Sequence, residues 1–128
     1  MPASSRSLLL LAGSSGFLAV ALGAFGAHGL KATLDTLGTQ EAWRTASLYH
    51  LVHSVALLAL AGWSAAPAPR VQLIGQMWAL GIVLFSGSLY WLALGGPKLL
   101  GPVTPLGGLA FLAGWALVAV TAWTQKRA

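Results

Sequence analysis

Long apolar runs, separated by short polar or proline- and glycine-rich segments, dominate the hydropathy pattern of the chain. A transmembrane helix needs about 20 consecutive, mainly apolar residues. Four runs satisfy this requirement, at residues 7–27, 43–63, 71–94 and 106–123. The pattern therefore predicts an all-α fold, an integral membrane four-helix bundle, in a single domain of residues 1–128.

The second run carries signals for both of its ends. Thr39 is expected to be the N-cap, and Glu41 lies where the positive end of the helix dipole favours a carboxylate. Trp43 and Trp63 frame a stretch as long as the hydrocarbon layer is thick, and tryptophan is enriched at membrane interfaces. We expect these two side chains to lie at opposite membrane surfaces.

The first connection is the longest, and it contains leucines at helical spacing. Leu30, Leu34 and Leu37 alternate with Lys31 and Asp35, which lie on the opposite side of a helix in this register. This pattern predicts a short helix lying on the outer membrane interface. An ordinary solvated connector with incidental leucines remains the alternative.

Composition supports a membrane domain. The chain is 57% hydrophobic and 7% charged, with a mean hydropathy of +0.79, whereas about a quarter of the residues of soluble domains are charged. The net charge of +5 comes from scattered basic residues, so we expect contacts with membrane lipids and no nucleic-acid binding. The absence of cysteine excludes disulfides and thiolate chemistry.

Two features bear on the topology. The first run could be a signal peptide with Arg6 as its basic region, but it exceeds the usual apolar core of about 7–15 residues, so a retained helix is favoured. Four spans would place the termini and the second connection on one side of the membrane. That side carries Arg6, Arg70, Lys126 and Arg127, and the other carries Lys31, Arg44 and Lys98. The positive-inside rule then favours cytoplasmic termini.

Small residues recur at helical spacing in three of the predicted helices. Such positions let neighbouring helices approach closely in a membrane. The packing of this chain on itself and the packing of two copies into a homo-oligomer are both compatible with the pattern. The candidate packing residues are Gly16, Gly23, Gly26, Gly87, Gly107, Gly108 and Gly114.

Histidines lie inside the second run, with His53 near the membrane midplane and His50 nearer the outer surface. We expect His53 to point inward and to bond to a hydroxyl or a backbone carbonyl, because hydrocarbon cannot satisfy an imidazole. Both histidines are either neutral bridges between helices or a proton or ligand site. We predict no metal site and no cofactor, because no further ligand stands at their depth. We expect no enzymatic activity, since no carboxylate could orient a histidine base.

Several motifs together resemble a known family over almost the whole chain. They are residues 23–29 (GAFGAHG), 49–53 (YHLVH), 84–90 (LFSGSLY), 104–108 (TPLGG) and 114–115 (GW). In this combination and order they resemble the domain of unknown function 423 family, small bacterial inner-membrane proteins with relatives in animals. The resemblance implies a four-helix protein of the bacterial inner membrane, with no established activity, substrate or cofactor.

The motif positions suggest where a shared function would lie. Together with His50, and with Pro105 beside them, they could form one polar pocket that opens toward the outer side. The candidate pocket residues are His28, His50, His53, Ser86, Ser88, Tyr90 and Thr104.

Three functions are compatible with these features. The first is a non-enzymatic binding or accessory protein, which binds a lipid or a membrane-protein partner through its glycine-rich faces and the outer pocket. The second is an oligomeric conduit for a small solute or an ion, with His53 in the pathway. The inner halves of the helices offer few polar residues to line a conduit, so binding is the leading hypothesis. An enzyme using His53 or Tyr90 ranks third.

Overall fold

The computed structural model describes residues 1–125, and these residues contain helices and no strand. The elements are α1 (Ala3–Ala27), α2 (Lys31–Leu37), α3 (Gln40–Ala61), α4 (Ala68–Gly81), the π-helical η1 (Ile82–Gly87), α5 (Ser88–Ala93), the 3₁₀ turn η2 (Lys98–Leu100) and α6 (Val103–Thr124). The predicted all-α class is confirmed. Lys126 and Arg127, which contributed to the predicted orientation, lie outside the described residues.

Each predicted apolar run corresponds to a long helical segment that begins three or four residues earlier than expected. The sequence places proline inside two of these first turns, with Pro69 in α4 and Pro105 in α6. The first N–H groups of a helix have no intrahelical partner, so proline is tolerated there. Each proline thus marks the start of a helix, and the residues just before it already belong to the first helical turn.

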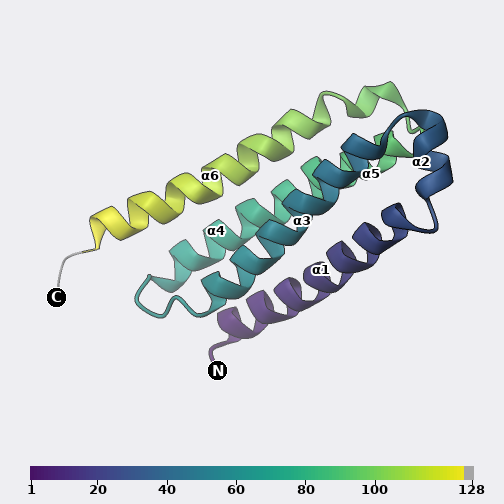
Figure 1. Ribbon diagram of the computed structural model, residues 1–128. Helices are drawn as coiled ribbons and strands as arrows, with labels where there is room; N and C mark the ends of the chain where they lie inside the picture. Colours follow the sequence, from purple (N-terminus) through teal and green to yellow (C-terminus); the bar gives the residue numbers. More distant parts are fainter. Residues whose placement is uncertain (126–128) are drawn as a thin grey trace.

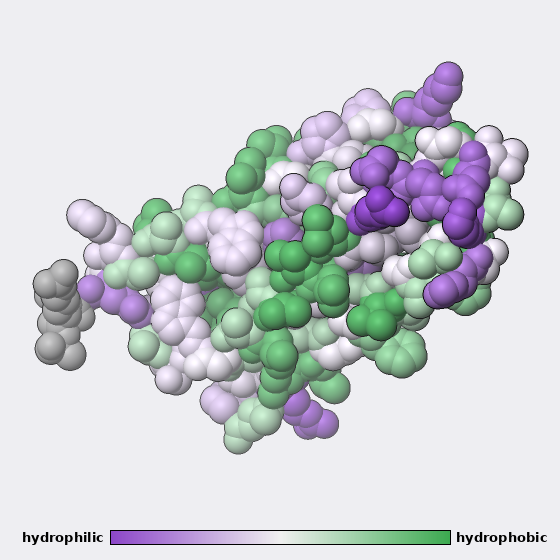
Figure 2. Space-filling model, in the orientation of Figure 1, coloured by the Kyte–Doolittle hydropathy of each residue, from purple (hydrophilic) through white to green (hydrophobic). Residues whose placement is uncertain are grey.

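Within residues 1–125, three helical segments are long and apolar enough to cross a membrane: Ala3–Ala27, Ala68–Ala93 and Lys98–Thr124. The middle one is continuous through α4, η1 and α5, because the residues at both junctions keep helical dihedral angles. Figure 2 shows apolar surface over the middle of the molecule and strongly polar side chains gathered near α2. The chain is therefore a multi-pass membrane protein.

The long helices lie alongside one another (Figure 1). α3 packs against α1 on one side and against α4, η1 and α5 on the other, while α6 packs against α4 and η1. The N-terminus, the α3–α4 turn and the end of α6 lie at one end, and α2 and the α5–α6 connection lie at the other (Figure 1). α3 is therefore the central helix, in contact with both neighbouring segments.

Trp43 is a core residue and not the interfacial anchor that the sequence suggested. Its side chain is 4% exposed, and its indole Nε1 donates a hydrogen bond of 2.8 Å to the carbonyl of Leu22 in α1. It packs in a cluster with Leu34 of α2 and Ala93 of α5. Tryptophan at the end of a membrane helix can face lipid or protein, and here α1 and α2 cover it. Trp63 is partly buried beside the main core.

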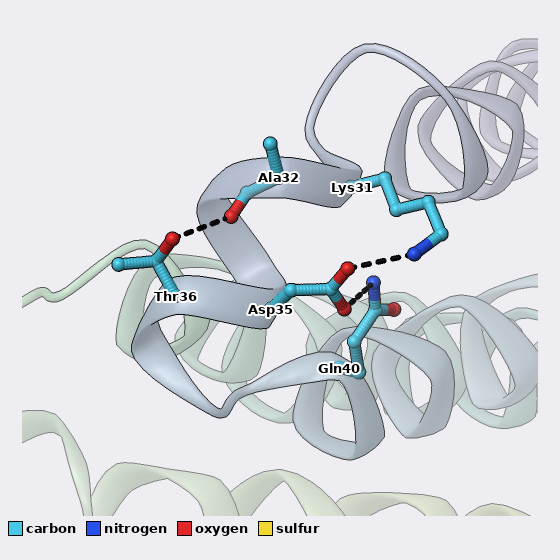
Figure 3. A network of polar contacts seen from close by, with 5 residues as sticks. All are labelled: Lys31, Ala32, Asp35, Thr36 and Gln40. Atoms are coloured by element: carbon cyan, nitrogen blue, oxygen red, sulfur yellow. Dashed lines mark hydrogen bonds and ion pairs between the residues drawn. The ribbon is translucent and has the colours of Figure 1, made fainter.

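The short helix predicted around residues 30–37 is present as α2. Leu34, on the inner face of α2, is fully buried. Gly38 ends the helix in the left-handed conformation that glycine adopts without strain. On the outer face Asp35 accepts hydrogen bonds from Lys31 at 2.7 Å and from Gln40 at 3.0 Å (Figure 3). The hydrogen bond from Lys31 is the main cause that lowers the pKa of Asp35. The network ties α2 to the first turn of α3.

Thr39 occupies the predicted N-cap position of α3, but its hydroxyl does not cap the helix. The Oγ1 atom donates a hydrogen bond of 2.6 Å to the carbonyl of Ala93, the last residue of α5. Carbonyls in the last turn of a helix lack intrahelical N–H donors. Thr39 therefore joins the start of α3 to the end of α5.

The predicted packing glycines differ in how much they constrain the fold. A Cβ atom at Gly26, Gly107 or Gly114 would overlap the Trp43 ring, the Phe85 backbone and the Trp78 ring respectively. At Gly16, Gly23 and Gly108 an added Cβ would make ordinary contacts of 3.8–3.9 Å. At Gly87 it would meet only the Ile82 carbonyl, at 4.0 Å. Sequence analysis missed Gly75, which Leu8 covers.

Candidate functional site

The two histidines of the predicted second span are both buried in α3, but they contact different helices. His50 is 5% exposed and His53 is 3% exposed. Residues three apart in an α-helix lie on adjacent sides, about 60° apart in direction, so the two rings meet different neighbours. His50 faces α1 and α5, whereas His53 faces α6. Each forms a separate hydrogen-bond network.

The His53 network is closed on every side. Nδ1 lies 2.8 Å from the carbonyl oxygen of Tyr49, and Nε2 lies 3.1 Å from Nε1 of Trp115. The imidazole stacks on the Phe111 ring with a centroid separation of 3.6 Å and an interplanar angle of 13°. An indole N–H only donates, so Nε2 accepts and Nδ1 carries the hydrogen that is donated to the carbonyl. This tautomer satisfies both ring nitrogens.

The prediction that His53 points inward and bonds to a hydroxyl or a backbone carbonyl is confirmed, with the carbonyl of Tyr49 as the partner. Its second partner, Trp115, was not identified as such from the sequence. The only signal was the Gly114–Trp115 pair among the family-like motifs. The pairing needs the long-range packing of α6 near α3, which local spacing does not reveal.

The His50 network is a chain of hydrogen bonds across three helices. Nδ1 lies 3.0 Å from the hydroxyl of Tyr90 in α5, and Nε2 lies 3.1 Å from Oγ of Ser15 in α1. Ser15 Oγ is 2.6 Å from Ser54 Oγ, and Ser54 in turn donates at 2.7 Å to the backbone carbonyl of His50. Ser47 lies 3.4 Å from the Tyr90 hydroxyl. Ser15 and Ser54 were not among the predicted site residues.

The direction of every bond in this chain follows from its last acceptor. A carbonyl oxygen cannot donate, so the single hydroxyl hydrogen of Ser54 goes to it, and the hydrogen between the two serines belongs to Ser15. Ser15 Oγ must then accept from Nε2 of His50. In a neutral imidazole Nδ1 is then the acceptor. It receives the single hydroxyl hydrogen of Tyr90 at 3.0 Å, in preference to the longer bond of 3.4 Å that this hydroxyl could donate to Ser47. His50 and His53 therefore carry their hydrogens on opposite ring nitrogens.

A groove of about 400 Å³ runs along this network, between α1 and the segment formed by α4, η1 and α5. His50, Tyr90, Ser14 and Ser15 supply its polar groups. Its other lining residues are Leu11, Leu18, Leu22, Ala79, Ile82, Val83 and Gly87. The groove therefore combines apolar walls with hydroxyl and imidazole groups and has no charged lining residue.

The other predicted pocket residues lie elsewhere. Ser86 donates to the carbonyl of Ala46 at 2.8 Å, which ties η1 to α3. The hydroxyls of Ser88 and Thr104 are 2.6 Å apart, at the contact with α6. His28 is exposed at the end of α1. The single pocket expected from the sequence is thus divided: Ser86 bonds to α3, whereas Ser88, two residues from both Ser86 and Tyr90, points toward α6.

The π-helical segment η1 has no counterpart in the sequence analysis. π-Helical turns within α-helices are frequent at functional sites. Here Ile82, Val83 and Gly87 of η1 line the groove, while Phe85 packs against Gly107 of α6. The segment η1 thus contributes both to the wall of the groove and to the contact with α6. In residues 1–125 no group of three or more histidine or acidic side chains is arranged to hold a metal.

Comparison with known proteins gives a consistent result. The family described as "Protein of unknown function (DUF423)" matches residues 22–108. The UPF0382 inner membrane protein YgdD of Escherichia coli (strain K12) is 47% identical over 129 residues, covering 96% of this chain and 94% of its own. The UPF0382 membrane protein YwdK of Bacillus subtilis (strain 168) is 40% identical over 119 residues, covering 91% and 96%.

A UPF0382 membrane protein of Staphylococcus saprophyticus is 38% identical over 115 residues, covering 90% of this chain and 95% of its own. No solved structure matches the chain. The resemblance noted in the sequence motifs is confirmed by matches that extend over nearly the full length. The chain belongs to the DUF423 family of membrane proteins of unknown function.

Proposed function

We propose that this protein is a non-enzymatic membrane protein that binds a lipid-like molecule in the groove between α1 and the α4–η1–α5 segment. The observation that carries the proposal is the groove of about 400 Å³ with a fully connected hydrogen-bond chain on its wall. Ligand sites commonly enclose about 300–1,000 Å³ and combine apolar lining with a few placed polar groups. The groove has both properties.

The proposed topology has four spans. α3 contains 22 residues and extends about 33 Å, enough to cross the hydrocarbon layer. Its hydropathy is lower than that of the other three long segments, and polar atoms of His50, His53 and Ser54 are bonded inside the protein. In this proposal the molecule is a four-helix bundle, and α2 lies at the outer interface.

The proposed location is the bacterial inner membrane, where the printed name of YgdD places that relative. We further propose that both termini face the cytoplasm. Arg6 and Arg70 lie at the end of the molecule that carries the N-terminus and the α3–α4 turn, and positive residues favour the cytoplasmic side.

Lipid is the proposed partner in preference to another protein or a second copy. Gly26, Gly107 and Gly114, three of the glycines where an added Cβ would overlap a neighbour, are covered by Trp43, Phe85 and Trp78 of the same chain. The helix faces around these glycines already pack against other helices of this chain, so a partner helix cannot use them. A homo-oligomer or an accessory complex would therefore need other surfaces.

The alternative of a conduit past His53 has less support. Both ring nitrogens of His53 are bonded, and its ring stacks on Phe111. A proton or ion passing this side chain would have to displace the Trp115 N–H, which cannot act as an acceptor. The groove at His50 is the better candidate for binding.

The test is a variant that fills the groove without disturbing the helices. A leucine at Gly87 would project where only the Ile82 carbonyl lies, at 4.0 Å, and Gly87 has helical dihedral angles. Gly13→Leu is the matched control, because nothing lies within 4 Å of an added Cβ and Gly13 lines a different cavity. Both variants should fold.

The measurement is the lipid retained by each protein after purification in mild detergent, determined by native mass spectrometry. We expect wild type and Gly13→Leu to retain a bound lipid, and Gly87→Leu to lose at least four-fifths of it, roughly the effect of a binding-energy loss near 1 kcal/mol. Equal retention by all three proteins would contradict binding in this groove.

A further inference from the structure

We infer that the ligand of the groove is a neutral long-chain alcohol: a single hydrocarbon chain that ends in a free hydroxyl group. The inference rests on the proposed lipid-binding function and specifies the chemistry that the same groove selects. It follows from the direction of the hydrogen bonds on the groove wall, from the charges around the groove and from its size.

The first step concerns which groove atoms are still free to bond. The hydroxyl hydrogen of Tyr90 is donated to His50 Nδ1, and that of Ser15 is donated to Ser54. Ser14 donates its own at 2.8 Å to the carbonyl of Leu10 in its own helix. These three side chains line the groove, and each oxygen has only lone pairs left to offer. The groove therefore presents hydrogen-bond acceptors without a free hydroxyl donor.

The second step is the complementary requirement on the ligand. A group that faces only acceptors is satisfied when it donates a hydrogen, as an alcohol does. An ether, ester or ketone has only acceptors and would leave its oxygen unpaired against Ser14, Ser15 and Tyr90. Burying a polar atom without a partner costs about 1–3 kcal/mol. The groove therefore favours a hydroxyl over a carbonyl or an ether.

The third step concerns charge. No Lys, Arg, Asp or Glu lines the groove. A phosphate or carboxylate headgroup would meet only lone pairs there and would be buried without a counter-ion, which is strongly unfavourable. An ammonium group could donate, but both acidic residues of the chain, Asp35 and Glu41, lie outside the groove in α2 and the first turn of α3. The head of the ligand is therefore neutral.

The fourth step concerns the size and lining of the groove. A volume of about 400 Å³ is near the lower limit for ligand sites, which favours one hydrocarbon chain over a two-chain lipid. The walls beside the polar groups are formed by Leu11, Leu18 and Leu22 of α1 and by Ile82 and Val83 of η1. A single chain can lie along these side chains while its hydroxyl reaches the serines.

The experiment compares three probes of equal chain length on the purified, lipid-stripped wild-type protein in detergent. The probes are hexadecanol, its methyl ether and hexadecanoate, each competing with a photoreactive hexadecanol analogue whose cross-linking is measured by mass spectrometry. We expect the alcohol to compete at least five-fold better than the ether, the ratio for about 1 kcal/mol. Hexadecanoate, with its charge, should be at least 100-fold weaker than the alcohol.

Two serine variants test the acceptor directly. Ser14→Ala removes one groove oxygen without breaking the His50 chain, because Ser14 bonds only within α1. Ser7→Ala is the control, since Ser7 makes the same kind of bond, at 3.0 Å to Ala3, but does not line this groove. Hexadecanol should bind about three- to five-fold more weakly to Ser14→Ala and equally to Ser7→Ala, while binding of the ether is unchanged in both.

The outcomes separate the inference from the function on which it rests. Equal competition by the alcohol and the ether, with both blocked by Gly87→Leu, would overturn the alcohol and keep the groove. Binding of no probe by folded wild-type protein would also overturn the alcohol, and a different lipid retained by wild type but not by Gly87→Leu would keep the proposed function. Cross-linking that Gly87→Leu leaves unchanged would overturn both.

Discussion

His50 and His53 lie within one turn of the same helix, yet their networks have different capacities. His53 faces a carbonyl, which only accepts, and an indole N–H, which only donates. Both of its partners are fixed in their roles, and aromatic rings enclose it. His50 faces two hydroxyls: that of Ser15 accepts, because its hydrogen goes to Ser54, whereas that of Tyr90 can donate or accept.

The difference indicates which histidine can change its protonation state without losing a hydrogen bond. If His50 gained a proton at Nδ1, the Tyr90 oxygen could accept it and turn its own hydrogen toward Ser47, 3.4 Å away. If His53 gained a proton at Nε2, it would lose its bond to Trp115 and gain none. Hence His53 is expected to be a structural contact between α3 and α6, while His50 can adapt to the contents of the groove.

Among the tests of this comparison, His53→Ala should have the largest effect on the free energy of unfolding. The change removes a ring stacked on Phe111 and leaves Nε1 of Trp115 without its partner, so we expect a loss of about 3 kcal/mol in the free energy of unfolding. The measurement is reversible unfolding in mixed micelles. Leu48→Ala, at a site that is 58% exposed, is the control and should change stability little. A loss below about 1 kcal/mol for His53→Ala would contradict its structural role.

His50→Ala should be less damaging. It also frees Tyr90 and Ser15, but these groups line the groove, where detergent, lipid or water can reach them. We therefore expect a loss of about 1–2 kcal/mol in the same unfolding assay. The ratio of the two losses is the informative quantity. If His50→Ala proved the more destabilising, the assignment of His53 as the closed contact would be wrong.

Tyr90→Phe removes the bond of 3.0 Å to His50 together with the longer contact of 3.4 Å to Ser47. The variant keeps the ring against Trp43 but leaves Nδ1 of His50 without a donor, at an expected loss of about 1 kcal/mol. Tyr49→Phe is the matched control, because no side-chain hydrogen bond of the Tyr49 hydroxyl is found among residues 1–125. An equal loss in the two variants would show that the bond to His50 contributes nothing.

A nitrogen NMR measurement sharpens the comparison without changing the chain. At neutral pH His53 should carry its hydrogen on Nδ1 and His50 should carry it on Nε2, because their partners fix opposite tautomers. Imidazole labelled with ¹⁵N distinguishes the two forms by chemical shift, with His53→Ala used for assignment. The same tautomer at both histidines would refute the hydrogen-bond directions deduced for one of the two networks.

The smallest effect is expected for the exposed network on α2. The hydrogen bond from Lys31 lowers the pKa of Asp35 in the folded protein, so its contribution is present above the unfolded pKa and is lost as the pH falls through the folded pKa. Because the pair is exposed, Asp35→Asn should leave the unfolding midpoint at neutral pH unchanged. A clear shift at neutral pH would assign the pair a larger role than its exposure suggests.

Sequence reasoning succeeded where one residue type at one position had a single physical meaning. The apolar runs predicted all four long helical segments, and the leucine spacing predicted α2. It also foresaw that His53 would bond to a hydroxyl or a backbone carbonyl, and the partner is a carbonyl. It placed Thr39 correctly at the N-cap position but did not foresee where its hydroxyl bonds, and it did not foresee the burial of Trp43 inside the protein. These outcomes depended on α1 covering Trp43 and on the end of α5 lying beside Thr39.

The sequence by itself determined that this is a helical membrane protein of the DUF423 family, because hydropathy and motifs are properties of the linear chain. Only the tertiary structure decided that Ser15 joins His50, that Trp115 joins His53, and that a groove opens beside one histidine and not the other. These partners are 35 and 62 residues apart in the chain. Hydrogen-bond direction depends on which atoms meet, and helix packing alone brings them together.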